Sequence, residues 1–176
     1  MKLFFTACAL SFFITANVLA EKADRNKPIH LEADRATVED VNRKESTRIS
    51  TFIGNVILTQ GTLRIKADKL VMKEDINGFR HATATGNLVT FRQKRDGLNE
   101  YVEGWSERAE YDSKADKIEL FRRARLKRGE DEVNGDYISY EMSNEFFKVV
   151  GNDNRNIESA PNKRVRITIQ PKNKSE

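Results

Sequence analysis

The chain has very little cysteine: Cys8 is the single one in 176 residues. Cys8 lies within an apolar run at residues 3–14 that follows Lys2, a pattern typical of a secretory signal peptide. A cleaved signal would leave no thiol, so the sequence excludes disulfide bonds, a cysteine nucleophile and a thiolate zinc site from the mature chain. Packing and sheet hydrogen bonds must then stabilise the fold without covalent help.

Histidine is equally scarce, and residues for catalysis are few. His30 and His81 have no ligand partners at metal-site spacing. Glu32 and Asp34 share one face of an expected strand, which permits acid–base chemistry but is more typical of a solvated surface. The glycines are spread over turns and form no phosphate loop. We therefore expect a protein that is not an enzyme and has no metal site and no cofactor.

Helical periodicity is missing as well, and short alternating runs take its place. Phe52, Val56 and Leu58 share one parity, and the parity changes to Leu63 and Ile65 after the turn at residues 60–62. A short connection containing glycine between two such runs predicts a hairpin. Similar runs recur at intervals of roughly 8–12 residues, as in all-β folds. We predict an all-β chain, with helix scarce.

A glycine-asparagine pair recurs along the chain and indicates a degenerate repeat. It occurs at residues 54–55, 86–87 and 151–152. Further turns are expected near residues 42–43 and at 77–78, 94–97, 113–116 and 129–131. We divide the chain into a signal peptide (1–20), a flexible N-terminal segment (21–27), one β domain (28–170) and a polar tail (171–176).

Hydrophobic residues make up 38 % of the chain and charged residues 33 %, which is lean for a thick core. A sheet with one apolar face, or an open groove, suits this composition better. The apolar parities place Val56, Leu58, Ile65 and Leu120 on the inner face. The large aromatic residues indicate an ordinary core, or a groove that a guest completes.

The densest charge is the basic run at residues 122–128. On a strand, Arg123, Arg125 and Lys127 would form one column able to bind phosphate, although a solvated face is the default interpretation. Nucleic acid is not an expected partner, because no aromatic side chains for base stacking alternate with these cations. Arg122 interrupts the apolar parity of this strand.

Four motifs, in the same order along the chain, resemble the OstA-like β-jellyroll family. They are Pro-Ile-His-Leu-Glu-Ala-Asp at 28–34, Phe-Ile-Gly-Asn-Val-Ile-Leu-Thr-Gln-Gly-Thr at 52–62, Ala-Asp-Lys at 67–69, and Val-Glu-Gly at 102–104. The resemblance covers nearly all of residues 28–150. It implies an open, V-shaped antiparallel β-jellyroll whose apolar inner groove holds the acyl chains of lipopolysaccharide in the periplasm.

By the same resemblance, the inner groove would include Ile29, Leu31, Phe91 and Tyr111. The partners would be lipopolysaccharide and the inner-membrane-anchored and outer-membrane components of its export machinery. The sequence departs from the family pattern at two places: Arg122-Arg123 stands where a third Gly-Asn is expected, and the polar Ser113 occupies a lipid-facing position.

Both ends of the domain carry cleanly alternating runs, at residues 29–33 and 165–169, bounded by Pro28 and Pro171. Proline at these places is typical of edge strands, and an exposed edge can pair with another chain. We expect head-to-tail self-association if the edges lie at opposite ends of the roll, or a closed barrel if they pair with each other. Two other functions remain open: a structural adaptor without lipid, and an exported jelly-roll carbohydrate-active enzyme.

Overall fold

A computed structural model describes residues 24–42, 47–78, 80–151 and 164–170. Ten strands in these residues form one antiparallel sheet, and the N-terminal 3-10 turn η1 (Asp24–Asn26) precedes them. No helix in the described part of the chain is long and apolar enough to span a bilayer. The strands are β1 (Ile29–Glu32), β2 (Arg35–Asn42), β3 (Thr47–Gln60), β4 (Leu63–Glu74), β5 (Arg80–Lys94), β6 (Tyr101–Asp112), β7 (Lys117–Arg128), β8 (Asp131–Glu141), β9 (Phe146–Val150) and β10 (Arg166–Thr168).

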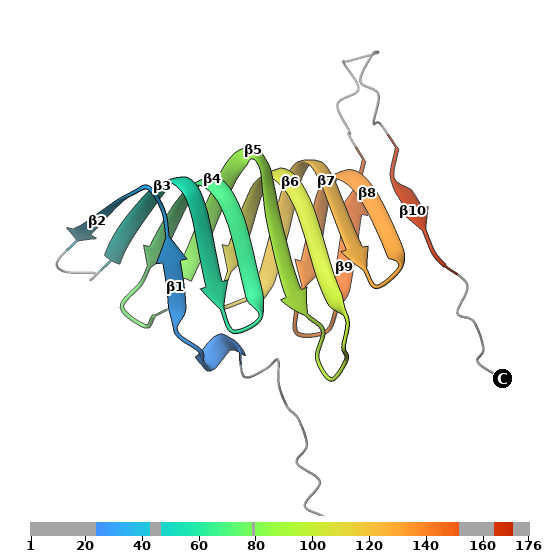
Figure 1. Ribbon diagram of the computed structural model, residues 1–176, viewed down its shortest axis with the longest axis horizontal. Coiled ribbons are helices and arrows are strands. Elements are labelled where there is room, and N and C mark those ends of the chain that lie inside the picture. The colour runs from blue at the N-terminus through green and yellow to red at the C-terminus, as the bar shows by residue number, and fades with distance from the viewer. Residues whose placement is uncertain (1–23, 43–46, 79, 152–163, 171–176) are drawn as a thin grey trace, which may run out of the picture.

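The sheet follows chain order across the molecule, as β1-β3-β4-β5-β6-β7-β8-β10. β2 also pairs with β3, and β9 also pairs with β8. Each edge is therefore built from two short strands that share one long neighbour. The two edges lie at opposite ends of the roll (Figure 1), so the closed-barrel alternative is wrong.

Each long strand bends near its middle, so the single sheet folds over into a V (Figure 1). The pairing registers shift at these bends, for example between Ile53 and Val56 and between Phe121 and Ala124. We call the half that contains β1 and β10 layer A, and the half that contains β2 and β9 layer B. The turns of both layers lie on the side opposite the bends, which we call the mouth. The expected all-β, open, V-shaped jellyroll is confirmed.

The glycine-asparagine repeat makes a bend in β3, where Gly54 and Asn55 both have positive φ, 84° and 47°. Asp34, between β1 and β2, stabilises this bend: its backbone N–H donates to the Gly54 carbonyl at 3.0 Å, and its carboxylate accepts from the Asn55 amide at 3.0 Å. Asp68 accepts a hydrogen bond from the Asn87 N–H at the next bend, at 2.9 Å. The aspartate of each Ala-Asp motif therefore stabilises a bend at a Gly-Asn motif.

In β7 the bend is formed by Arg122 and Arg123, whose φ angles are 61° and 51°. This is the left-handed conformation that Asn55 adopts in β3, here held by two residues that pay a steric cost for it. The bend turns Arg122 out to solvent, although its parity would place it inside. Arg122-Arg123 thus stands where a Gly-Asn pair was expected, and the backbone keeps the same left-handed shape.

The N-terminal segment differs from the expectation in residues 24–27. Asp24 is 5 % exposed and sits on the β3–β4 turn. Its carboxylate accepts hydrogen bonds from the Thr62 N–H and hydroxyl, at 2.9 and 2.5 Å, and the Lys27 carbonyl accepts one from the Gln60 amide at 3.1 Å. The prediction of a flexible segment is wrong for these residues. The turn that donates hydrogen bonds to Asp24 lies 38 positions away in the sequence, so no local pattern indicates the contact.

The long strands also extend further than the alternating runs suggested. β5 runs unbroken from Arg80 through Gly86 and Asn87, where the sequence indicated a strand only from Leu88. Turns at 77–78, 94–97, 113–116 and 129–131 are confirmed. The turn expected near Asn42 falls beside residues 43–46, outside the described chain, and the flanking strands β2 and β3 pair as a hairpin.

The strain at Arg122 predicts that Arg122→Gly stabilises the protein. A left-handed residue other than glycine costs roughly 1–2 kcal/mol, part of which the extra backbone entropy of glycine offsets. We expect the free energy of unfolding, measured by urea denaturation, to rise by about 1 kcal/mol. Gly54→Ala is the control at the matching bend and should destabilise, since a Cβ there would lie 2.2 Å from Asp34 Oδ2. A loss of stability in Arg122→Gly would contradict this account.

Candidate functional site: an apolar interior between two layers

The inner faces of the two layers enclose a continuous apolar interior. Layer A supplies Val56, Leu58, Ile65 and Phe91, which are 1–2 % exposed. Layer B supplies Leu120, 1 % exposed, and Tyr111, 7 % exposed. These six side chains come from five strands. All of them are buried, and Val56, Leu58, Ile65, Phe91 and Leu120 belong to one core cluster, because alternate residues of each strand half point inward.

Ile29 and Leu31 complete this interior at the N-terminal edge. They lie on β1, are partly buried, and pack against the core cluster. All eight residues expected on the inner face are therefore on it. The sequence did not single out other buried residues, among them Leu70, Ala82, Ile138 and Tyr140.

The two layers touch each other in this structure. The rings of Phe91 in layer A and Tyr140 in layer B are stacked with centroids 6.4 Å apart. Gly104 makes this contact possible, because a Cβ there would lie 2.1 Å from the Phe91 ring and 2.9 Å from Leu120. Burial raises the pKa of the Tyr140 hydroxyl well above its usual value. The interior is thus filled by the protein's own side chains, and a guest between the layers would have to separate them.

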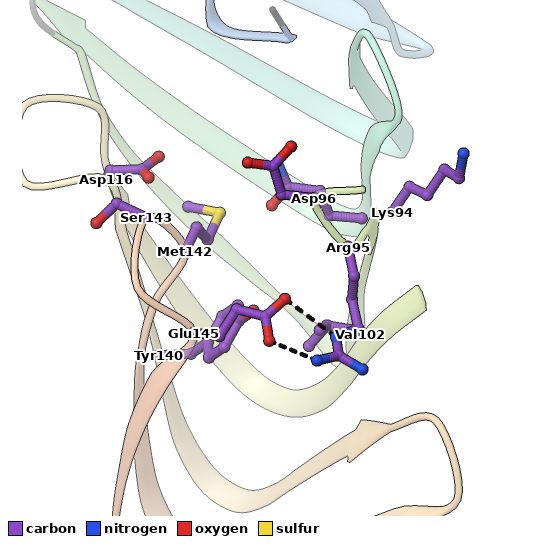
Figure 2. Close-up of a pocket in the computed structure, with 10 residues that line it drawn as sticks. Lys94, Arg95, Asp96, Val102, Asp116, Tyr140, Met142, Ser143 and Glu145 are labelled. Atoms are coloured by element: carbon purple, nitrogen blue, oxygen red, sulfur yellow. Dashed lines mark hydrogen bonds and ion pairs between the residues drawn. The ribbon is translucent and has the colours of Figure 1, made fainter. Parts of the chain in front are cut away.

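An ion pair across the mouth joins the two layers, as Figure 2 shows. Arg95, in the β5–β6 turn of layer A, donates to both carboxylate oxygens of Glu145, in the β8–β9 turn of layer B, at 3.0 and 2.6 Å. Both side chains are largely buried, 18 % and 25 % exposed. The hydrogen bonds to Glu145 raise the pKa of the Arg95 guanidinium, so this guanidinium stays charged at physiological pH.

Two neighbours reinforce this contact. Glu100, in the same turn as Arg95, pairs with it at 2.5 Å. Arg128 of layer A donates to the Glu145 carbonyl at 3.4 Å, and its guanidinium lies over the Phe147 ring. We call Arg95 and Glu145 the latch. It links positions 50 residues apart, so no local sequence pattern indicates it.

The basic residues expected in one column have separate surroundings. Arg125 and Lys127 lie on the outer face of layer A, whereas Arg123 is at the bend. Arg125 pairs with Glu132 at 2.6 Å and lies over the Trp105 ring at 4.7 Å. Hydrogen bonds from Arg125 and Asn134 lower the pKa of Glu132. The charge of Arg125 is therefore largely offset, while Arg123 contacts only the Glu107 carboxylate, at 3.7 Å, among the described ion pairs.

The polar Ser113 has a structural partner. Its hydroxyl accepts a hydrogen bond from the Arg80 N–H at 2.8 Å, and its own N–H donates to the Arg80 carbonyl at 3.0 Å. Ser113 thereby ties the start of β5 to the end of β6, at the mouth of layer B. Its polarity serves this connection between strands.

Chemistry at this interior is limited to burial of apolar groups. Among the described residues, no three of histidine, cysteine, aspartate and glutamate gather as a metal site would need. His81 lies 3.6 Å from Asp112 on the outer face, and His30 is on β1 far along the sheet. The site is a long apolar surface with a closable opening, which suits extended hydrocarbon better than a compact polar molecule.

Comparison with known proteins agrees with this architecture. Residues 30–146 match the model of the family described as LptA/(LptD N-terminal domain) LPS transport protein. The lipopolysaccharide export system protein LptA of Escherichia coli K12 is 33 % identical over 129 residues, which are 69 % of this chain and 63 % of that protein. The protein of the same name from Haemophilus influenzae is 30 % identical over 147 residues, 78 % of each chain.

A solved structure shares the fold. The crystal structure of LptH, described as the LptA homologous periplasmic component of the lipopolysaccharide transport device from Pseudomonas aeruginosa, superposes with a TM-score of 0.73. It is 23 % identical in sequence, and the match covers 85 % of this chain and 99 % of LptH. This chain spans about 63 % of the length of the Escherichia coli relative. The bent sheet, its apolar interior and its motifs thus have one explanation: the chain belongs to the LptA/(LptD N-terminal domain) family of LPS transport proteins.

Proposed function

We propose that this protein is a periplasmic carrier that shields the acyl chains of lipopolysaccharide between its two layers and bridges the inner and outer membranes. The observation that carries the proposal is the continuous apolar interior, which is lined by strands from one edge of the sheet to the other. The relatives' names, which describe lipopolysaccharide export, point to the same cargo. The protein binds and transports, and carries out no chemical reaction.

The physical need for a shield follows from the cost of wetting hydrocarbon. Exposing a methylene group to water costs about 0.8 kcal/mol, so ten methylenes of one acyl chain cost about 8 kcal/mol. Several chains on one lipid therefore do not cross an aqueous gap unprotected. The inner faces offer apolar area without a polar anchor, so lipid can slide along Val56, Leu58, Ile65, Leu120 and their neighbours.

Loading requires the layers to part. The acyl chains would replace the contacts that Phe91, Tyr111 and Tyr140 make across the interior, and would keep these surfaces dry. Ile29 and Leu31, partly buried at the N-terminal edge, would be the first inner residues reached by lipid from a neighbouring protein. The latch would open during this step.

Crosslinking tests which face holds lipid. A photo-reactive amino acid at Phe91 or Tyr111 should form covalent adducts with lipopolysaccharide, and one at Arg64, exposed on the outer face of layer A, should not. Adducts are detected by a mobility shift and immunoblotting. Adducts from Arg64 alone would disprove an interior groove. Their absence from all three positions, with the protein folded, would favour a structural adaptor without lipid.

Weakening the latch should accelerate lipid uptake. Glu145→Gln keeps the shape but removes the charge, and a hydrogen bond to a charged group contributes about 1.5–3 kcal/mol. Part of this energy holds the mouth closed, so we expect uptake of fluorescent lipopolysaccharide, followed by stopped flow, to be roughly 3- to 10-fold faster. Glu74→Gln is the control, because Glu74 pairs with Arg80 at 2.9 Å within layer B. Equal acceleration in both variants would show that the latch does not control the rate of lipid uptake.

Self-association through the sheet edges is the finer part of the proposal. β1 and β2 at one edge, and β9 and β10 at the other, present N–H and C=O groups that another copy or a membrane-anchored partner can use. Pairing of unlike edges does not close, so copies add end to end and their interiors run on as one channel. The same edges would engage the inner-membrane-anchored and outer-membrane components.

Deleting residues 164–176 tests this assembly. β10 pairs with β8 over three residues, all of them exposed, so its loss leaves the interior intact. We expect the truncated protein to remain folded and to bind lipid, but to lose its concentration-dependent oligomers in sedimentation velocity. Persistence of oligomers of the same size, or loss of the β-sheet circular dichroism signal, would show that β10 has a different role.

A further inference from the structure

We infer that the protein has a second binding site, for a phosphoryl group, in a cavity at the C-terminal end of the roll. The cavity lies where β10 meets the bends of β7 and β8. Three arginines line it: Arg123 from the bend of β7, Arg166 from β10, and Arg164, which precedes β10. The remaining lining residues are Ala124, Asn134 and Gly135.

Like charges have been brought together here from distant parts of the chain. Arg166 pairs in register with Asn134 of β8, and Asn134 pairs with Arg125 of β7. β10 therefore delivers its arginines beside the bend that presents Arg123. Guanidinium groups that converge on one space repel each other, and an anion between them removes that repulsion.

Among the described residues, the ion pairs near the cavity leave this charge largely unmatched. Glu107 pairs with Arg123 at the long distance of 3.7 Å, and both side chains remain exposed to solvent. Glu132 is occupied by Arg125 at 2.6 Å and by Asn134 at 3.0 Å. Neither acid lines the cavity. No acidic partner of Arg164 or Arg166 is found among the described residues.

The backbone at the bend provides an independent reason to assign a role to Arg123. The bend of β3 uses glycine and asparagine, the residues that adopt left-handed conformations most easily, whereas β7 holds two arginines at φ 61° and 51°. Strained backbone of this kind clusters at functional sites. Arg123 combines a left-handed backbone with a place in the lining of the cavity.

Size and chemistry select a phosphoryl group. The cavity measures about 230 Å³, several times the share of one water molecule, about 30 Å³. Guanidinium forks bind the oxygens of phosphate in pairs, and three of them match a dianion better than a single carboxylate. The shared chemistry allows two sources: a phosphate on a lipid head group, or free inorganic phosphate.

The position of the cavity favours the lipid, and to that extent the inference depends on the proposed function. Ala124 belongs to the apolar core cluster and also lines the cavity, so one residue of β7 is shared by the core and the cavity. A lipid whose acyl chains lie between the layers at this end could place a head-group phosphate among the three arginines while leaving the roll.

A titration with inorganic phosphate, followed by ³¹P NMR on the full chain at low ionic strength, tests the site without lipid. We expect saturable binding that Arg123→Gln/Arg166→Gln weakens at least roughly tenfold. The control is Arg64→Gln/Lys66→Gln, which removes the same charge from another basic cavity of about 230 Å³ on the outer face, where Arg92 is paired with Glu103. Equal weakening in both variants, or no saturable binding, would overturn the inference.

Lipid distinguishes the two sources. If the source is the head group, phosphorylated lipid should bind the native protein more tightly than the same lipid after phosphatase treatment, and Arg123→Gln/Arg166→Gln should abolish that difference while crosslinks from Phe91 persist. Phosphate binding without a preference for phosphorylated lipid would assign the site to free phosphate. If a photo-reactive residue at Phe91 gives no lipid crosslinks in the protein with native arginines, although phosphate still binds, the carrier function is refuted and the phosphoryl site is retained.

One result would assign the cavity to a protein partner. Suppose that Arg123→Gln/Arg166→Gln leaves phosphate binding unchanged but abolishes self-association in sedimentation velocity. The three arginines would then bind carboxylates of another copy, and the phosphoryl site would be disproved.

Discussion

The bend across the middle of the sheet is the constraint on which the rest of this structure depends. A flat antiparallel sheet of this composition would expose its apolar face, and the bend brings two halves of that face together. The bend is held by neighbouring segments of the chain, through Asp34 at Gly54-Asn55 and through Asp68 at Asn87. Polar side chains on the outside thereby determine whether the protein has an apolar inside.

The interior is held together by many weak, non-directional contacts and by one stronger, directional ion pair. Dispersion and burial between the layers, as at Phe91, Gly104 and Leu120, have no preferred partner and can be exchanged for contacts with hydrocarbon at little cost. The latch between Arg95 and Glu145 is specific and lies at the opening. This division suits the proposed carrier: bound lipid would replace most of the contacts that hold the layers together, and the latch would determine when the mouth opens.

Local pattern was sufficient to predict much of the fold. Alternation around Gly61 and the turn at Asn77-Gly78 predicted strands and hairpins, because parity and turn chemistry depend on adjacent residues. The same parity correctly placed Val56, Leu58, Ile65 and Leu120 inside. The V shape came from the family resemblance, since no local signal states that a strand bends back over its own sheet.

What the sequence missed depends on contacts between distant positions. Asp24 was assigned to a flexible segment because its turn partner is 38 residues away, and the latch joins residues separated by 50. The sequence correctly indicated that charge is concentrated in the basic run. It did not indicate that Arg123 lines one cavity with Arg164 and Arg166, because the pairing of β10 with β8 brings these residues near it. Composition indicates how much charge a chain has, and topology determines which charges meet.

The split edges also restrict which chains can add to this protein. β1 and β2 meet at the bend as two short segments, and β9 and β10 cover separate halves of β8. A straight strand, of the kind that stacks in amyloid, can follow only one half before the edge turns away from it. A chain bent at the same level can follow both halves. The shape that encloses the interior would therefore also select between partners: under the proposed self-association it would admit copies of its own fold, and it interrupts the flat stacking that would make an exposed edge prone to aggregation.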